Sequence, residues 1–365
     1  MPCFDMVVVG SGGGPDETNL SAYLIKPFHA NWGDGIVALE AGSGMGALTQ
    51  ILKHTPDLFT SRLQDCNSAP GYSASAIYSF IRCFLITHAH LDHVNSLIIS
   101  AGSLGGSRKR IFATEQTLHD LETVFADRIW PNLASWKEDD DSFRYLYTSL
   151  LTDDQYRNVA TDISVRTMPI SHGHNDTSGV YDSAAFFVRH DPSTREFLFF
   201  GDVSPDTLSP KPRTVNVWRA AAAKIPLTLS TIFIECSWPS GRADDLLYGH
   251  LSPIHLADEL TVLATEVAMA RKFVVKDLRN ESGPTRKKSK SNPLSPESLY
   301  GALDGVRVFV IHCKDGHEVT YDRSINHIIA DQVRALVAAK RLGADILAAD
   351  QGMRIGASMI LMHSI

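Results

Sequence analysis

Short apolar runs, each followed by polar or glycine-containing residues, recur along the whole chain. Runs of about four to eight residues that are rich in Val, Ile, Leu and Phe are typical of buried β-strands. We therefore predict strands at Met6–Gly10, Ser21–Ile25, Gly35–Leu39, Arg82–Thr87, Ile163–Met168, Ala184–Arg189, Phe197–Phe200, Thr231–Glu235, Phe273–Val275, Arg307–Ile311 and the tail Ile355–Ile365.

Apolar residues at helical spacing alternate with these strands. They predict helices over Met45–Leu52, Pro253–Ala270 and Asn326–Lys340. Ser252 is a suitable N-cap for the second helix, with Pro253 at its first position. The stretch from Thr114 to Leu151 also has helical spacing and many aromatic residues, so we expect it to cover the sheet and regard it as a candidate lid or dimer contact.

The alternation of strands and helices shows no repeat period and no second core, which predicts a single catalytic domain over residues 1–365. One segment, about 278–298, interrupts the pattern. It is rich in Ser, Pro and Asn and contains the basic run Arg286–Lys290. This composition is typical of a flexible surface insertion.

The amino-acid composition and net charge argue against several classes of function. Hydrophobic content of 44% and charged content of 21% are ordinary for a soluble enzyme. The net charge of −7 argues against broad binding to nucleic acid or to an anionic membrane. The five cysteines include no CxxC pair, so neither a disulfide framework nor a thiolate zinc site is indicated. The sequence shows no secretory signal and no apolar run of membrane-spanning length, so we expect a cytoplasmic protein.

Candidate metal ligands are concentrated directly after the predicted strand Arg82–Thr87, in the sequence His-Ala-His-Leu-Asp-His. If the chain is still extended there, His88 and His90 point to the same side. Asp92 and His93 follow as the chain turns towards a helix. Imidazole suits zinc and similar ions, and a carboxylate can serve a second ion. The cluster therefore predicts a two-metal site.

A site for two ions needs further ligands, and other strand ends supply candidates. His172 follows one predicted strand, although His174 competes with it for the same role. Asp202 follows a second strand and could bridge both ions, and His312 ends a third. His250 lies before a helix instead of after a strand, so we interpret it as a catalytic residue more than a ligand.

Together these motifs resemble the class II 3′,5′-cyclic-nucleotide phosphodiesterases of the metallo-β-lactamase superfamily. The resemblance rests on the segments Gly10–Pro15, Ser21–Leu24, Thr87–His93, Pro169–Gly173, Phe200–Asp202, Ile234–Ser237, Tyr248–Pro253 and His312–Lys314. It implies an α/β fold, the metallo-β-lactamase-like αββα sandwich, in which two packed mixed sheets are flanked by helices and the site lies on strand-end loops.

The resemblance also implies the ligands of two divalent metal ions. One ion would bind His88, His90 and His172, the other Asp92, His93 and His312, with Asp202 between them. The histidine-rich shell favours Zn²⁺, with Mn²⁺ or Mg²⁺ as alternatives. His250 would assist proton transfer, with Glu235 as its partner, and Asp92 would also orient the attacking hydroxide. At Glu40 this chain departs from the superfamily, which usually has Asp in that turn.

The implied reaction is hydrolysis of a small-molecule substrate, cAMP first and cGMP second, to the 5′-nucleotide by a hydroxide that two metal ions activate. A homodimer is compatible with this architecture. Two alternatives remain open. A transfer-RNA 3′-processing endonuclease shares the chemistry but needs a basic surface for RNA, and a non-catalytic cyclic-nucleotide-binding protein would bind without turnover. No motif identifies the residues that contact the base.

Overall fold

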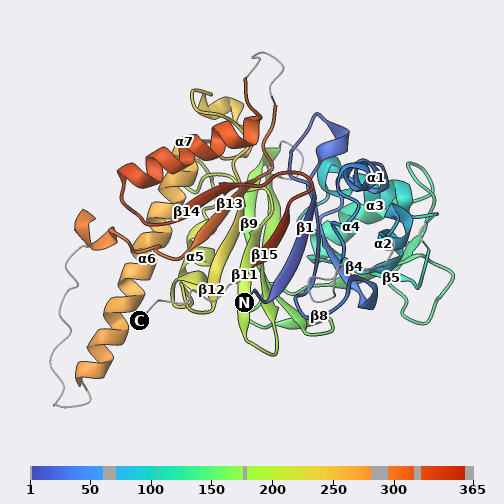
Figure 1. Cartoon of the computed structure of the whole chain (residues 1–365), viewed down its shortest axis with the longest axis horizontal. Coiled ribbons are helices and arrows are strands. Elements are labelled where there is room, and N and C mark those ends of the chain that lie inside the picture. Colours follow the sequence, from blue (N-terminus) through green and yellow to red (C-terminus); the bar gives the residue numbers. More distant parts are fainter. Residues whose placement is uncertain are drawn as a thin grey trace.

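The computed structural model describes residues 2–60, 71–103, 105–175, 179–280, 295–315 and 322–357. Two β-sheets pack face to face, and helices cover the outer side of each (Figure 1). The predicted metallo-β-lactamase-like αββα sandwich is therefore confirmed. None of the helices described is both long enough and apolar enough to cross a membrane.

The first sheet has the strand order β15-β1-β2-β3-β4-β5-β7-β6. Its strands are β1 (Phe4–Gly10), β2 (Ala22–Pro27), β3 (Ile36–Leu39), β4 (Ile81–Leu85), β5 (Lys109–Ala113), β6 (Ala134–Ser135), β7 (Tyr145–Ser149) and β15 (Arg354–Ala357). Strands β3, β4, β5 and β7 run parallel, whereas β15, β1, β2 and β3 are antiparallel neighbours. Its helices are α1 (Met45–His54), α2 (Ala74–Phe80), α3 (Leu91–Ser100) and α4 (Glu115–Val124).

The second sheet has the order β14-β13-β12-β11-β10-β9-β8. Its strands are β8 (Arg157–Ala160), β9 (Ile163–Asn175), β10 (Gly179–His190), β11 (Arg195–Phe200), β12 (Leu229–Glu235), β13 (Arg307–Ile311) and β14 (Asp345–Ala348). Its helices are α5 (Thr214–Ala222), α6 (Pro253–Asn280) and α7 (Ile325–Ala339). Short 3₁₀ turns lie at Glu17–Asn19, Trp32–Asp34, Asp244–Leu246 and Pro296–Leu299.

Strand β1 shows why these apolar runs form doubly buried strands. Met6 and Val8 point into the layer between the two sheets, whereas Val7 and Val9 point towards the helices of the first sheet. Because successive side chains of a strand point to opposite faces, a strand covered on both faces is apolar at most positions; Asp5, the exception in β1, is buried in an ion pair with Arg354. Aromatic rings fill the layer between the sheets, as in the edge contact of Tyr23 and Phe199 at 5.2 Å between centroids.

Most predicted strands and helices are confirmed, but the strand at Phe273–Val275 is wrong because these residues belong to α6. The β-branched pair there favours a strand locally. However, no Gly or Pro occurs between Pro253 and Asn280, so the helix continues through it.

The helical interpretation of Thr114–Leu151 is wrong in part. The segment contains α4, but it also contains the strands β6 and β7, which extend the first sheet beyond β5. Of the predicted tail strand, β15 ends at Ala357, and residues 358–365 lie outside the described residues. Residues 281–294, with the basic run, also lie outside them.

The start of α5 depends on a carboxylate that precedes it in the chain. Asp206 accepts hydrogen bonds from the backbone N–H groups of Arg213, Thr214 and Val215 at 2.8–3.0 Å. We expect Asp206→Ala to lower the free energy of unfolding by about 1–2 kcal/mol, because the helix start loses its acceptor. Urea unfolding checks this. The exposed pair Asp258–Lys340 at 3.1 Å provides the control, and an equal loss in Asp258→Ala would contradict the assignment.

Candidate metal centre

Seven predicted metal ligands converge at one edge of the sandwich, where several parallel strands end. They form two groups, His88 with His90, His172 and Asp202, and Asp92 with His93, Asp202 and His312. In each group the ligand atoms all lie within 4.8 Å of one another. The convergence follows from topology, because β11, β12 and β13 are parallel neighbours and their carboxyl ends meet at the same edge.

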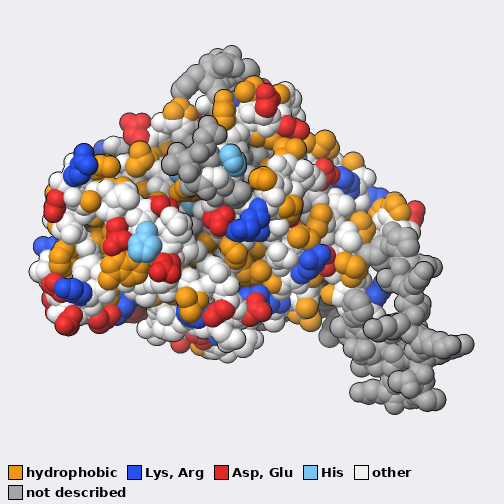
Figure 2. Space-filling model, turned by 180° about the vertical axis from the view of Figure 1, so that it is seen from behind, with side chains coloured by type: hydrophobic (Ala, Val, Ile, Leu, Met, Phe, Trp, Pro, Cys, Tyr) orange, Lys and Arg blue, Asp and Glu red, His pale blue; other side chains and the backbone are white. Residues whose placement is uncertain are grey.

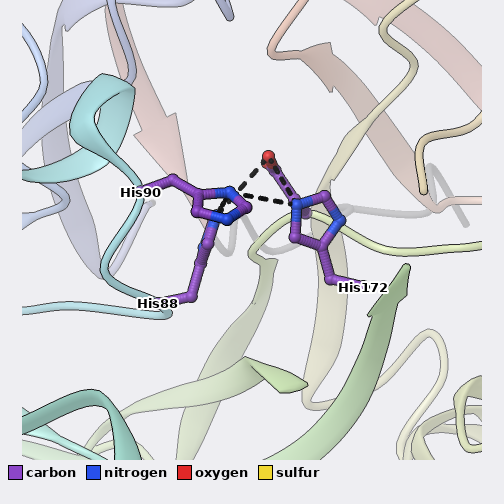
Figure 3. A group of neighbouring side chains, drawn as sticks. His88, His90 and His172 are labelled. Carbon is purple, nitrogen blue, oxygen red and sulfur yellow. Dashed lines mark hydrogen bonds and ion pairs between the residues drawn. The ribbon is translucent and has the colours of Figure 1, made fainter. Parts of the chain in front are cut away.

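The first group surrounds a single point (Figure 3). Nδ1 of His90 lies 3.1 Å from Nε2 of His88 and 3.3 Å from Nε2 of His172. Oδ2 of Asp202 lies 3.6 Å from the same two Nε2 atoms. Three imidazole nitrogens and one carboxylate oxygen, supplied by four separate positions, therefore face each other.

The second group has the same character and shares one residue with the first. Nε2 of His312 lies 3.0 Å from Nε2 of His93 and 3.1 Å from Oδ2 of Asp92. Asp202 reaches this group as well, with Oδ1 at 3.2 Å from His93 and Oδ2 at 3.3 Å from His312. Asp202 is thus the one carboxylate that belongs to both groups.

The outward nitrogens of these imidazoles are held by partners around the site. Nδ1 of His88 lies 3.0 Å from Oγ1 of Thr87, and Nδ1 of His312 lies 3.0 Å from Oγ of Ser237. Nδ1 of His172 donates to the carbonyl oxygen of Gly249 at 2.9 Å. A proton fixed on Nδ1 leaves the lone pair of Nε2 directed inward, which is the usual arrangement of metal-binding histidines.

His93 has a carboxylate in this position. Its Nδ1 lies 3.5 Å from Oε2 of Glu40, a residue that is buried and adopts a positive φ of 58°. Oε1 of Glu40 also accepts a hydrogen bond from the backbone N–H of Thr87 at 3.3 Å. The longer side chain at this position therefore still reaches the site, where its carboxylate lies beside the outward nitrogen of His93, one of the predicted ligands.

The charges of the site fit divalent cations. Burial acts to raise the pKa of Asp202, but the imidazoles of His312 and His93 hold that pKa well below its usual range. Burial acts to lower the pKa of His93, yet the carboxylates of Asp202 and Glu40 raise it well above its usual value. Oδ2 of Asp202 is buried without a hydrogen-bond donor. The cluster thus has a negative group that needs a cation, and its N and O donors suit zinc-like ions.

A buried pair, His250 and Glu235, adjoins the two groups. Nδ1 of His250 lies 3.0 Å from Oε1 of Glu235. The carboxylate of Glu235 also accepts from the backbone N–H groups of Val203 and Leu251, at 3.0 and 3.2 Å. Burial lowers the pKa of His250 to about 4 and raises that of Glu235. Glu235 is therefore fixed in place and orients the imidazole of His250.

Comparison with known proteins identifies the family of this chain. The family model described as "cAMP phosphodiesterases class-II" matches residues 7–352.

The chain belongs to the class-II cAMP phosphodiesterase family.

Individual relatives agree with this family. The chain is 32% identical over 279 residues to a 3′,5′-cyclic-nucleotide phosphodiesterase of Schizosaccharomyces pombe, covering 72% of this chain and 76% of the relative. The crystal structure of unliganded yeast PDE1 superimposes with a TM-score of 0.76 at 23% identity, covering 96% and 99% of the two chains. A metallo-beta-lactamase fold protein of Bacillus subtilis matches with a TM-score of 0.53 at 12% identity, covering 97% and 99%.

In this class-II family member a cavity of about 510 Å³ opens beside the first group of ligands. Its wall includes His90, His172, Tyr181, Tyr248 and His250. His174, the competitor of His172, also lines the cavity but is exposed, whereas His172 is buried. The structure therefore includes His172, and not His174, in the first group.

Sequence reasoning missed several residues that support the site of this class-II enzyme family. The ring of Tyr181 stacks on His90, with centroids 4.7 Å apart and an interplanar angle of 12°. Lys314 donates to the carbonyl oxygen of Gly13 at 2.6 Å and lies 3.5 Å from Oδ2 of Asp92. Gly13 itself has no room for a side chain, because a Cβ there would lie 2.4 Å from the ring of His312.

These residues differ in whether they lie within a recognisable sequence motif. Ser237 and Lys314 lie inside motifs that carried the family resemblance, so their position was marked but their contacts were not. Tyr181 lies on β10 outside every such motif. Its contact with His90 joins two positions that are distant in the sequence, so it becomes visible only in the folded structure.

Proposed function

We propose that this chain hydrolyses 3′,5′-cyclic nucleotides, cAMP and cGMP, to 5′-nucleotides with the help of two divalent metal ions. The observation that carries the proposal is the pair of donor groups that share Asp202 beside a cavity. The cavity volume of about 510 Å³ lies in the range of small-ligand sites. The family match supports the same chemistry.

The two groups define which residues would hold the ions. His88, His90 and His172 would bind one ion, Asp92, His93 and His312 would bind the other, and Asp202 would contact both. When bound, such ions polarise phosphoryl oxygens and make a coordinated water acidic near neutral pH. The predominance of imidazole favours Zn²⁺.

The protein side chains then have separate tasks. The nucleoside part of the substrate occupies the cavity beside His90 and Tyr181, so that its phosphate lies above Asp202. Asp92, at the first turn of α3, orients the attacking water in line with the bond from phosphorus to O3′. That bond breaks, and His250 delivers a proton to the leaving oxygen, while Glu235 holds the opposite nitrogen of the ring. The proton that the attacking water gives up restores the proton of His250 by the end of the cycle.

The face of the molecule in Figure 2 agrees with a small substrate. On the face shown in Figure 2, the Lys and Arg side chains of the described residues are interspersed with Asp and Glu side chains. A transfer-RNA nuclease needs a continuous basic surface, since phosphate contacts dominate the affinity for nucleic acid. Three statements stay predictions: that the chain does not bind nucleic acid, that it forms a homodimer, and that it is cytoplasmic.

The direct test is hydrolysis of cAMP and cGMP by the purified chain, with the 5′- and 3′-monophosphates measured separately. We expect the 5′-nucleotide only, and we expect a chelator to abolish turnover and added Zn²⁺ to restore it. A short structured RNA serves as the control substrate. Cleavage of the RNA with no turnover of either cyclic nucleotide would contradict the proposal, as would full activity in a chain shown to be free of metal.

A further inference from the structure

A second group of metal-binding side chains lies far from the candidate active site. One donor atom of each of His29, Asp162 and His190 lies within 4.8 Å of the other two. His190 ends β10 beside Arg195, the first residue of β11, whereas Asp202 follows the other end of β11. The length of β11 at about 3.3 Å per residue puts roughly 20 Å between the two groups.

The three side chains come from both sheets of the sandwich. His29 follows β2 of the first sheet, whereas Asp162 lies in the turn between β8 and β9 of the second. Nε2 of His29 lies 3.4 Å from Oδ2 of Asp162, and the rings of His29 and His190 make an edge contact at 5.5 Å. An ion bound here would connect the two sheets at the edge opposite the active site.

The decisive atom is Nε2 of His190. This histidine is only 8% exposed, and its Nε2 is buried without a hydrogen-bond partner. Its Nδ1 lies 2.8 Å from Oγ of Ser193, which also accepts from the backbone N–H of Arg195 at 3.4 Å. In the tautomer that donates its Nδ1 proton to Ser193, Nε2 keeps a free lone pair. Leaving such an atom unpaired is costly, and a metal ion would use it.

The other two ligands can complete the site. A tetrahedral zinc ion with bonds of about 2.0–2.2 Å has its ligands roughly 3.3–3.6 Å apart. The observed 3.4 Å between His29 and Asp162 meets this spacing. The side chain of His29 is 58% exposed, so it is free to move towards His190. Asp162 is less mobile, because its carbonyl oxygen accepts from the backbone N–H of Asp191 at 3.0 Å.

We propose that His29, Asp162 and His190 bind one zinc-like divalent ion, with water as a further ligand, and that this ion stabilises the packing of the two sheets. A simple ion pair of His29 with Asp162 accounts for their contact but leaves Nε2 of His190 without a partner. The metal site accounts for both observations. Its ligands are separate from the seven residues of the candidate active site.

The test is to count zinc ions on the full-length chain and to titrate it with zinc chloride alone. We expect three ions per chain in the wild type and two in His29→Ala, Asp162→Asn and His190→Ala, with zinc affinity at this site reduced by about 100-fold or more in each variant. Zinc should raise the midpoint of thermal unfolding more in the wild type than in the variants. Turnover of cAMP should stay unchanged.

His327→Ala is the matched control, because His327 pairs with Asp350 at 2.9 Å but belongs to none of the donor groups found among the described residues. It should keep all three ions. His29 is exposed, so His29→Ala should fold normally even if His190→Ala does not. Equal zinc counts and equal zinc-dependent stabilisation in the wild type and His29→Ala would overturn the proposal, whether or not the chain hydrolyses cyclic nucleotides.

Discussion

Asp202→Asn is expected to lower the turnover of cAMP by about 10³-fold or more, because metal-assisted charge stabilisation is worth several kcal/mol. The reason is that Asp202 is the carboxylate shared by the two donor groups. Asn keeps the shape of the side chain but removes its negative charge. The neighbouring histidines hold the pKa of the Asp202 carboxyl group well below its usual range, so this charge is present in the wild type. The chain should therefore also lose bound metal, which elemental analysis after dialysis measures.

The control for this substitution is Asp345→Asn, at the exposed start of β14. It should change neither metal content nor turnover. If Asp202→Asn kept both ions and its activity, Asp202 would not join the two groups. If it kept both ions but lost activity, its role would be in orienting the substrate instead of holding metal.

His250→Ala is expected to lower kcat for cAMP by about 10²–10⁴-fold, the usual contribution of a general acid. Metal content should stay the same, because His250 lies beside the two ligand groups, with its Nδ1 held by Glu235 at 3.0 Å. Steady-state kinetics on protein of known metal content measures this effect. Full turnover in this variant would remove His250 from the mechanism.

A second substrate separates proton donation from positioning. The p-nitrophenolate group of bis(p-nitrophenyl) phosphate leaves without protonation, so His250→Ala should impair this substrate much less than cAMP. The control is His119→Ala. His119 lies on α4, is half exposed, and pairs with Glu122 at 2.6 Å instead of with a residue of the candidate site. Equal losses on both substrates would mean that His250 positions the substrate and does not donate the proton.

Asp202 and His312 could be predicted from the sequence because each follows a doubly buried strand. His172 lies within β9 and not after it, because this strand continues to Asn175, beyond the predicted end at Met168. An apolar run such as Phe197–Phe200 can be read without knowledge of its neighbours, and a polar residue directly after it lies at a sheet edge. The family motifs then indicated which of these strand ends lie close together in the fold. The structure brings Asp202 and His312 together in the way that these two signals suggested.

What the sequence could not predict depends on pairing between distant segments. The strand at Phe273–Val275 was wrong because local β-branching was outweighed by the helix that precedes it. Strand β7 was missed although Tyr145 and Tyr147 have the two-residue spacing of a strand, because the run is short and lies in a segment that also contains the helix α4. The group around His190 comes from the end of β10 and two turns that share no motif, so only the paired sheets show it.

The contact of His93 with His312 spans 219 positions of the chain, which has a consequence for biosynthesis. At a translation rate of about 5–20 residues per second, His312 leaves the ribosome roughly 10–45 s after His93. During that interval the nascent polypeptide carries only part of the second donor group. A metal ion that uses all the donors of that group could bind only after β13 and His312 have been synthesised.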